Sequence, residues 1–161
     1  QGKVLLTNDS VGAGLAVQTD GKLVLVGRKN VAAPPAPLNQ FAVMRLNANG
    51  SPDGTFGSQG RVSTPVTTGG DEALAVALQA DGKIIAAGRS NSQVNSNFAL
   101  ARYSTAGVLD ASFGNDGIVE VDFFGFTDIA ESVAIMSDGR IVAGGLARDN
   151  VDGYGVVRVL P

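Results

Sequence analysis

The sequence predicts an all-β protein made of three four-stranded antiparallel sheets in a propeller-like repeat. Two short apolar segments joined by Asp-Gly occur three times, centred on Gly21, Gly82 and Gly139. These glycines are 61 and 57 residues apart, which indicates a repeat of about 60 residues. The apolar segments are too short, and too often interrupted by Gly, to be helices. Asp-Gly between such segments favours a two-residue type I′ hairpin turn, which needs a positive φ at both positions.

Each repeat contains four predicted strands. The predicted strands of the first repeat are residues 3–7, 15–18, 22–26 and 41–46. Those of the second are 61–66, 73–79, 83–88 and 98–103, and those of the third are 118–122, 132–136, 140–143 and 154–160. The copies cover about residues 1–47, 60–105 and 117–161 of one domain, joined by linkers at 48–59 and 106–116. The middle two strands of each copy are apolar on both faces, which indicates sheets packed between neighbouring sheets.

Composition excludes several classes of function. The net charge is −3, and Lys and Arg are scattered along the chain, so the basic stripe of a nucleic-acid-binding protein is missing. The chain has no Cys and no His, which excludes disulfides, thiolate or imidazole metal sites and His-dependent catalytic triads. No apolar run approaches the roughly 18 residues of a membrane-spanning helix. We therefore expect no cofactor, no metal site, no nucleic-acid partner and no membrane span.

An aromatic residue in each repeat is followed four positions later by an arginine. The aromatic residues are Phe41, Phe98 and Tyr154, and the arginines are Arg45, Arg102 and Arg158. Because alternate residues of a strand share a face, each arginine lies beside its aromatic residue, where an unpaired charge is costly. Asp53 and Asp110 follow the first two arginines by eight residues. We predict that these arginines and aspartates form structural ion pairs.

The linkers carry a motif of their own. The second copy contains it in full, with the aromatic-Arg pair before it, at Phe98, Arg102, Gly107, Leu109, Asp110, Phe113, Gly114 and Gly117. In these residues the chain resembles the delta-60 repeat family of bacterial surface and secreted proteins. The first copy has Pro52 where the second has Leu109, and the third ends before the linker. The resemblance implies a propeller-like β architecture in large extracellular proteins, and it implies no catalytic residues.

These observations predict a non-catalytic structural or binding module of a bacterial cell-surface or secreted protein, with a carbohydrate or a surface protein as a candidate partner. All length variation between complete repeats falls at residues 28–40, 89–97 and 146–153, which we interpret as surface loops. The binding candidates in these loops are Arg28, Asn30, Arg89, Asn91, Asn95, Arg148 and Asp152.

The alternative is a carbohydrate-active propeller enzyme of the glycoside hydrolase type, which needs a pair of carboxylates. The candidate carboxylates precede the second strand in the second and third copies. They are Asp71, Glu72, Asp128 and Glu131. We interpret these side chains as solvated loop residues rather than as a catalytic pair.

Two other groups of residues have a structural and a functional interpretation. Alternating oxygen-bearing side chains, Asn47, Asn49, Ser51 and Asp53, resemble the start of a calcium loop, and the second copy lacks two of them. A polar turn explains them without a metal. The aromatic group at residues 123–126 suits a carbohydrate or partner platform, or the filled core of a junction between sheets, which we favour.

The number of sheets predicts self-association. Three sheets stacked face to face leave two large apolar faces uncovered, more than monomeric proteins usually expose. Two chains could close a six-sheet ring about a twofold axis, which we favour, or successive chains could stack head to tail into a filament. The chain begins without Met or a signal pattern, so we interpret it as a mature or excised piece; an excerpt of a longer repeat protein is the third possibility.

Overall fold

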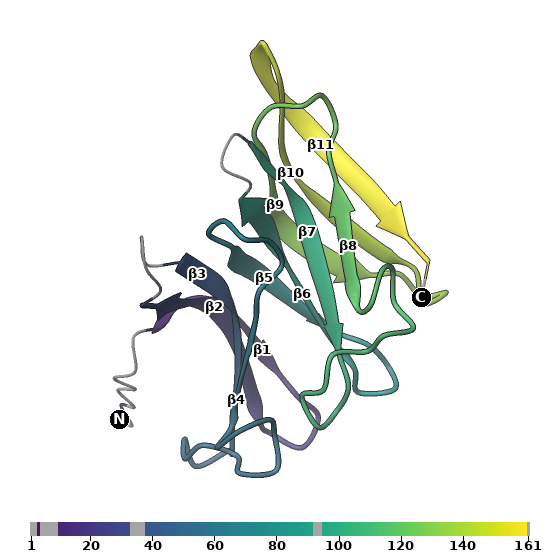
Figure 1. Ribbon diagram of the computed structural model, residues 1–161. Coiled ribbons are helices and arrows are strands. Elements are labelled where there is room, and N and C mark those ends of the chain that lie inside the picture. The colour runs from purple at the N-terminus through teal and green to yellow at the C-terminus, as the bar shows by residue number, and fades with distance from the viewer. Residues whose placement is uncertain (1–2, 4–9, 33–37, 92–94, 161) are drawn as a thin grey trace.

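Figure 1 shows the computed structural model, which describes residues 3, 10–32, 38–91 and 95–160. These residues form three antiparallel sheets and no helix, so the all-β prediction is confirmed. The first sheet contains β1 (Ser10–Val17), β2 (Leu23–Val31), β3 (Leu38–Leu46) and β4 (Arg61–Thr64). The second contains β5 (Glu72–Leu78), β6 (Ile84–Asn91), β7 (Ser96–Tyr103) and β8 (Ile118–Val121). The third contains β9 (Asp128–Ile135), β10 (Ile141–Asp149) and β11 (Val151–Val159).

The described part of the chain holds no helix that is long and apolar enough to cross a membrane.

The predicted grouping of strands is wrong in one respect. The strand that begins at Arg61 does not open the second sheet; β4 pairs with β3, and in the same way β8 pairs with β7. The linker reverses the direction of the chain and brings its two ends together. The Arg45 backbone N–H, before the linker, donates to the Gly60 carbonyl, at its end, at 2.9 Å. The next strand therefore runs back along the strand that preceded the linker. Because β8 belongs to the second sheet, the described residues of the third sheet form three strands instead of the predicted four. The predicted strand at residues 3–7 lies, apart from Lys3, outside the described residues.

The hairpin turns also differ from the prediction. Gly21, Gly82 and Gly139 have φ values of 80°, 84° and 86°, but the aspartates before them do not have a positive φ. The Gly21 N–H donates to the Gln18 carbonyl at 2.9 Å, and the Asp20 carboxylate accepts the Lys22 N–H at 3.1 Å. The prediction of a type I′ turn is therefore wrong. The chain makes a longer turn that ends in a left-handed glycine, because the aspartate side chain stabilises it through the N–H two residues ahead.

Two hydrophobic clusters hold the three sheets together, and the middle sheet contributes to both. We call the face that a sheet turns toward the next sheet in the chain its forward face, and the opposite face its rear face. The forward faces carry Val24, Val26, Phe41 and Val43 in the first sheet and Ile85, Ala87, Phe98 and Leu100 in the second. The rear faces carry Ile84, Ala86, Ala99 and Ala101 in the second sheet and Ile141 and Ala143 in the third. Among the described residues, the rear face of the first sheet and the forward face of the third have no neighbouring sheet; they lie at the two ends of the stack in Figure 1.

Candidate functional site

The predicted Arg45–Asp53 pair is present and buried. The Arg45 Nε donates to the Asp53 carboxylate at 2.8 Å, and the two residues are 6% and 4% exposed. The guanidinium lies 4.7 Å from the centroid of the Phe56 ring and donates to the Thr105 carbonyl of the second sheet at 2.5 Å. One arginine thus ties together a strand, the linker that follows it and the turn of the neighbouring sheet.

The second pair repeats this arrangement, and the third arginine does not. Arg102 Nε donates to Asp110 at 2.9 Å, and its guanidinium lies 4.6 Å from the Phe113 centroid. Arg158 is exposed on β11, and in the described part of the chain it has no carboxylate within ion-pair distance. The first two arginines take their partner from a linker eight residues ahead, and residues 1–161 contain no such linker after Arg158, so its ion pair stays a prediction.

Both paired aspartates are held in the ionised form. Hydrogen bonds from the Thr55 hydroxyl and backbone N–H lower the pKa of Asp53 well below its usual value of 3.8, and Lys22 and Arg45 lower it further against the effect of burial. The pKa of Asp110 falls to about 2, chiefly through the Ser112 hydroxyl. These shifts are typical of structural acceptors in a folded linker.

Acid should therefore destabilise the fold over a defined range of pH. The folded-state pKa of Asp110 lies below its unfolded-state value of 3.8, so its contribution is present above about pH 4 and is lost as the pH falls toward 2. We expect the free energy of unfolding, measured with urea, to decrease across this range. In Asp110→Asn the decrease should be shallower, whereas the exposed control Asp116→Asn should follow the wild-type curve. Parallel curves for Asp110→Asn and wild type would contradict this assignment.

The carboxylates proposed for glycoside hydrolysis are occupied by structural contacts. Asp71 is fully buried and accepts four hydrogen bonds of 2.7–3.1 Å, from the N–H groups of Val66, Thr67 and Asn91 and from the Thr67 hydroxyl. Asp128, also fully buried, accepts the N–H groups of Phe123 and Arg148 at 2.8 and 3.2 Å. Each aspartate thus connects the residues just before it in the chain to the end of the next strand, which is β6 for Asp71 and β10 for Asp128. The interpretation as solvated loop residues is therefore wrong for this pair.

The other two carboxylates differ from each other. Glu72 accepts Arg28 of the first sheet at 3.0 Å and Arg89 of its own sheet at 3.1 Å, so it forms an ion bridge across the junction of the two sheets. Glu131 is exposed. Within the described ranges, no group of three or more acidic residues could hold a metal ion.

The predicted variable loops are largely strand. Arg28 and Asn30 lie in β2, Arg89 and Asn91 in β6, Arg148 in β10 and Asp152 in β11. The hairpin strands continue to pair beyond the second glycine of each repeat, as far as Val31 with Leu38, Asn91 with Ser96 and Asp149 with Val151. The length differences fall at the hairpin tips, and residues 33–37 and 92–94 lie outside the described residues.

The side chains of these candidates contact the protein itself. Arg148 Nε donates to Asp152 at 2.7 Å, and the Asn91 side-chain oxygen accepts the Ser96 hydroxyl at 2.7 Å. Asn95, between β6 and β7, donates to the Gly125 carbonyl. The structure spreads the candidates over three hairpins and does not gather them into one site.

The structure distinguishes the two interpretations of the polar turn at residues 47–53 and of the aromatic group at residues 123–126. Asn47, Asn49 and Ser51 bond to one another, with Ser51 donating to the Asn49 side-chain oxygen at 2.7 Å, which is the geometry of a polar turn. Phe123 packs edge-to-face on Phe98, with ring centroids 5.1 Å apart, so it belongs to the second cluster. Phe124 and Phe126 are exposed, so the prediction of a filled core is wrong for them.

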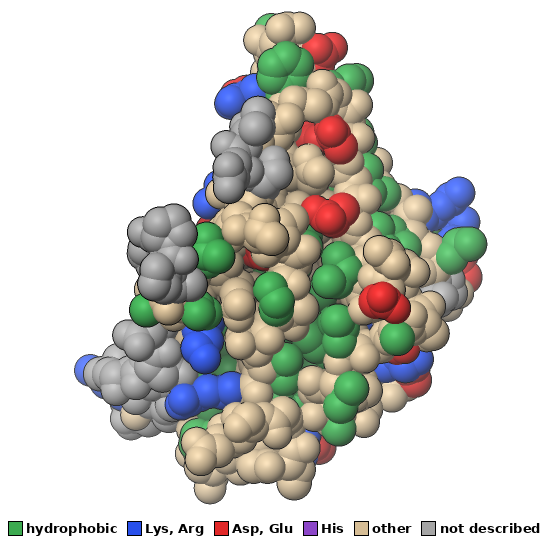
Figure 2. Space-filling view, in the orientation of Figure 1, with side chains coloured by type: hydrophobic (Ala, Val, Ile, Leu, Met, Phe, Trp, Pro, Cys, Tyr) green, Lys and Arg blue, Asp and Glu red, His purple; other side chains and the backbone are tan. Residues whose placement is uncertain are grey.

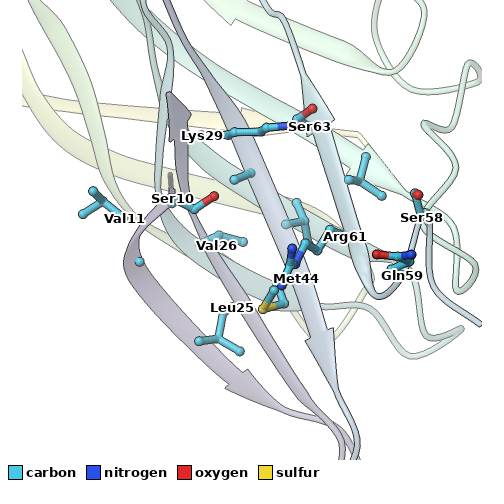
Figure 3. A pocket seen from close by; sticks show the side chains of 15 residues that line it. Ser10, Val11, Leu25, Val26, Lys29, Met44, Ser58, Gln59, Arg61 and Ser63 are labelled. Carbon is cyan, nitrogen blue, oxygen red and sulfur yellow. The ribbon is translucent and has the colours of Figure 1, made fainter. Parts of the chain in front are cut away.

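The uncovered rear face of the first sheet forms an open groove of about 680 Å³ across β1 to β4. Figure 3 shows Leu25 and Met44 among the side chains that line it, with Arg61 next to Met44 and Lys29 next to Ser63. On β1, Leu15 and Val17 are 59% and 61% exposed. Charged side chains are scattered over the side of the molecule seen in Figure 2 and form no continuous patch of one sign. Apolar and polar groups thus line the groove in about equal measure.

The uncovered forward face of the third sheet carries the most exposed aromatic residue of the repeat. Tyr154 is 100% exposed, whereas Phe41 and Phe98, at the same position of the first two repeats, are 0% exposed. Reasoning about loops did not identify this residue. The aromatic position of the third repeat could have identified it, because the same position is buried in the first two repeats and exposed in the third.

One family model matches the chain, and it is described as a domain of unknown function, DUF5122, of beta-propeller type. It matches residues 18–56 and 79–113. No curated protein matches significantly. Each matched segment begins at the glutamine before an Asp-Gly turn and ends at the linker phenylalanine that packs under the arginine. The strand pairing and this match together show that the chain is a propeller-like repeat domain. Over its first two repeats, the chain is similar to the DUF5122 family.

Proposed function

We propose that the chain is a non-catalytic structural module that acts by associating through its uncovered sheet faces. One observation carries this proposal: the repeat position that buries Phe41 and Phe98 completely leaves Tyr154 fully exposed. Because burial of an aromatic side chain is strongly favourable, a face of this composition is typical of a surface that is covered in use.

The contacts of the acidic side chains support a non-catalytic role. A carboxylate that acts as a general acid or nucleophile must reach the substrate. Asp71 and Asp128 are fully buried and accept backbone N–H groups, and Glu72 is held by two arginines. These contacts assign the three carboxylates to stability.

The proposed location is the surface of a bacterium or the medium around it. The support for it is the resemblance of the linker motif to the delta-60 repeat family. A surface protein built from stacked sheets gains length or closure by adding further sheets of the same kind.

Two measurements on the purified chain test this function. We expect sedimentation equilibrium to show reversible self-association at micromolar concentrations, and we expect no hydrolysis in a broad screen of glycans. Turnover that is abolished by Glu131→Gln in a variant that still folds would replace the structural role with a glycoside hydrolase. Loss of turnover in Asp71→Asn would count only with unchanged urea unfolding, because Asp71 is buried. A dispersed monomer at all concentrations tested would remove the role in assembly.

A further inference from the structure

We propose that the forward face of the third sheet binds the rear face of the first sheet of a second copy of this chain. This inference rests on the proposed self-association and specifies its polarity and its contact residues. The contact between chains would repeat the two contacts that already join the sheets within one chain. Three comparisons between equivalent repeat positions carry it.

The forward faces are equivalent position by position. Val43 and Leu100 are 1% and 0% exposed in the internal junctions, and Val156, at the same position of the third sheet, is 66% exposed. Tyr154 follows the same rule with Phe41 and Phe98. The third sheet therefore presents the surface that a rear face covers twice inside the molecule.

The rear faces are equivalent as well. Val76 and Leu78 of β5 pack into the first cluster, and Val133 and Ile135 of β9 pack into the second. The same positions of β1 are Leu15 and Val17, and both are exposed. In the groove, Leu25 and Met44 take the positions of Ala86 and Ala101, which are buried in the internal junction. The first sheet thus presents the surface that a forward face covers elsewhere.

Both internal junctions of the described residues join a forward face to a rear face. The first cluster brings Phe41 of the first sheet against Ala86 and Ala101 of the second, and the second cluster brings Phe98 of the second sheet against Ile141 of the third. Neither cluster joins two forward faces or two rear faces. The contact between chains is therefore head to tail.

A charged pair at the internal junction provides an independent test of this pairing. Arg28 on the first forward face donates to Glu72 of the second sheet at 3.0 Å. Val11 of β1 takes the repeat position of Glu72, and Leu146 of β10 takes that of Arg28. Within the first sheet Val11 lies opposite Arg28, on the edge strand β1. Head-to-tail docking places Leu146 against Val11, so both partners of the ion pair are replaced together by apolar residues. A buried charge without its partner would be costly, and this pairing contains none at that position.

The remaining junction obeys the same rule. Arg89 is the forward residue of the second sheet, and Ile129 takes the position of Glu72 in the third. The third sheet offers no carboxylate at that position, and Arg89 pairs with Glu72, which lies opposite it in its own sheet, at 3.1 Å. Each arginine of this position is thus paired with a carboxylate. Leu146 lies opposite the apolar Ile129 in its own sheet, and in the head-to-tail contact it meets the apolar Val11 of the next chain.

The contact is tested by trapping it with single cysteines, since the chain has none of its own. Val11→Cys and Leu146→Cys chains are prepared separately, mixed and oxidised under mild conditions. We expect the mixture to form at least about tenfold more disulfide-linked dimer than either variant alone. The matched control mixes Leu146→Cys with Val108→Cys, an exposed apolar residue in the turn between β7 and β8; it should give only the background yield.

The outcomes separate this inference from the proposed function. Self-association with preferential trapping of Val11→Cys or Leu146→Cys to itself would overturn the head-to-tail contact and leave a module that assembles in another way. Absence of any self-association would overturn both. A closed ring of two chains and an open filament each support the contact, because both are built from it.

A substitution on the forward face provides a second measurement. Tyr154→Glu should weaken association by about thirtyfold or more, as expected for an aromatic residue at the centre of an interface. Tyr154→Phe should retain association, and Val108→Glu should leave it unchanged. Urea unfolding of the monomers should be similar for all variants because Tyr154 is fully exposed within one chain. Unchanged association of Tyr154→Glu would contradict the assignment of this face.

Discussion

Replacing Arg45 with methionine should lower the free energy of unfolding by about 3 kcal/mol. The substitution keeps most of the apolar stem of the side chain but leaves the buried Asp53 carboxylate without its 2.8 Å partner. It also removes the contact with the Phe56 ring and the hydrogen bond to the Thr105 carbonyl across the junction. Lys22, whose Nζ lies 3.2 Å from Asp53, retains part of the compensation, so the loss should fall at the lower end of the range for a broken buried pair. Urea unfolding followed by circular dichroism measures it.

Arg158→Met is the matched control, because it makes the same change at the same position of the third repeat. Arg158 is exposed, and in the described residues no carboxylate pairs with it. The free energy of unfolding should change by less than about 0.5 kcal/mol, as is usual for surface substitutions. Equal losses for the two variants would show that the aliphatic stem, and not the ion pair, stabilises the linker.

Gly88→Ala should cost about 3 kcal/mol or more, although it adds only a methyl group. A Cβ atom at Gly88 would lie 2.0 Å from the carbonyl oxygen of Glu72 and 2.8 Å from the Cα atom of Ala73, and both are backbone atoms that cannot move separately from β5. The pairing of β5 with β6 shifts register between Ala73 and Ala75, and this bulge presses the carbonyl toward the glycine. Denaturant unfolding measures the loss.

Gly12→Ala is the control for this substitution. It also changes a glycine in a hairpin that carries a bulge, but a Cβ atom there would have no neighbour within 4 Å. Its free energy of unfolding should stay within about 0.5 kcal/mol of wild type. The close approach recurs at Gly27 and Gly145, where a Cβ atom would lie 1.9 and 2.1 Å from a backbone carbonyl oxygen. A tolerated Gly88→Ala would mean that the bulge can open without loss of pairing.

The close contact at Gly27, Gly88 and Gly145 explains why each repeat has a second glycine. The sequence shows a second glycine six residues after each turn glycine, and its role becomes evident only with the neighbouring strand in place. The functional candidates show the same limitation. Arg28 and Arg89 have the sequence context of surface loops, but their paired strands extend far enough to bring both onto Glu72.

The sequence by itself determined the features that depend on local chemistry and on repetition. The three Asp-Gly turns identify the hairpins, apolar residues on both faces of the central strands predict stacked sheets, and an arginine followed by an aspartate at eight residues predicts an ion pair. Each of these features is decided within a few residues, so a pattern read along the chain contains the information.

The tertiary structure alone decided where one sheet ends and the next begins. A repeat has the same period wherever its boundary is drawn, so β4 could be assigned to the first sheet only from its pairing with β3. Exposure was decided in the same way. Phe41, Phe98 and Tyr154 occupy one position of the repeat, and only the stacking of the sheets leaves the third of them uncovered. Burial depends on which surfaces meet, and residues far apart in the sequence supply those surfaces.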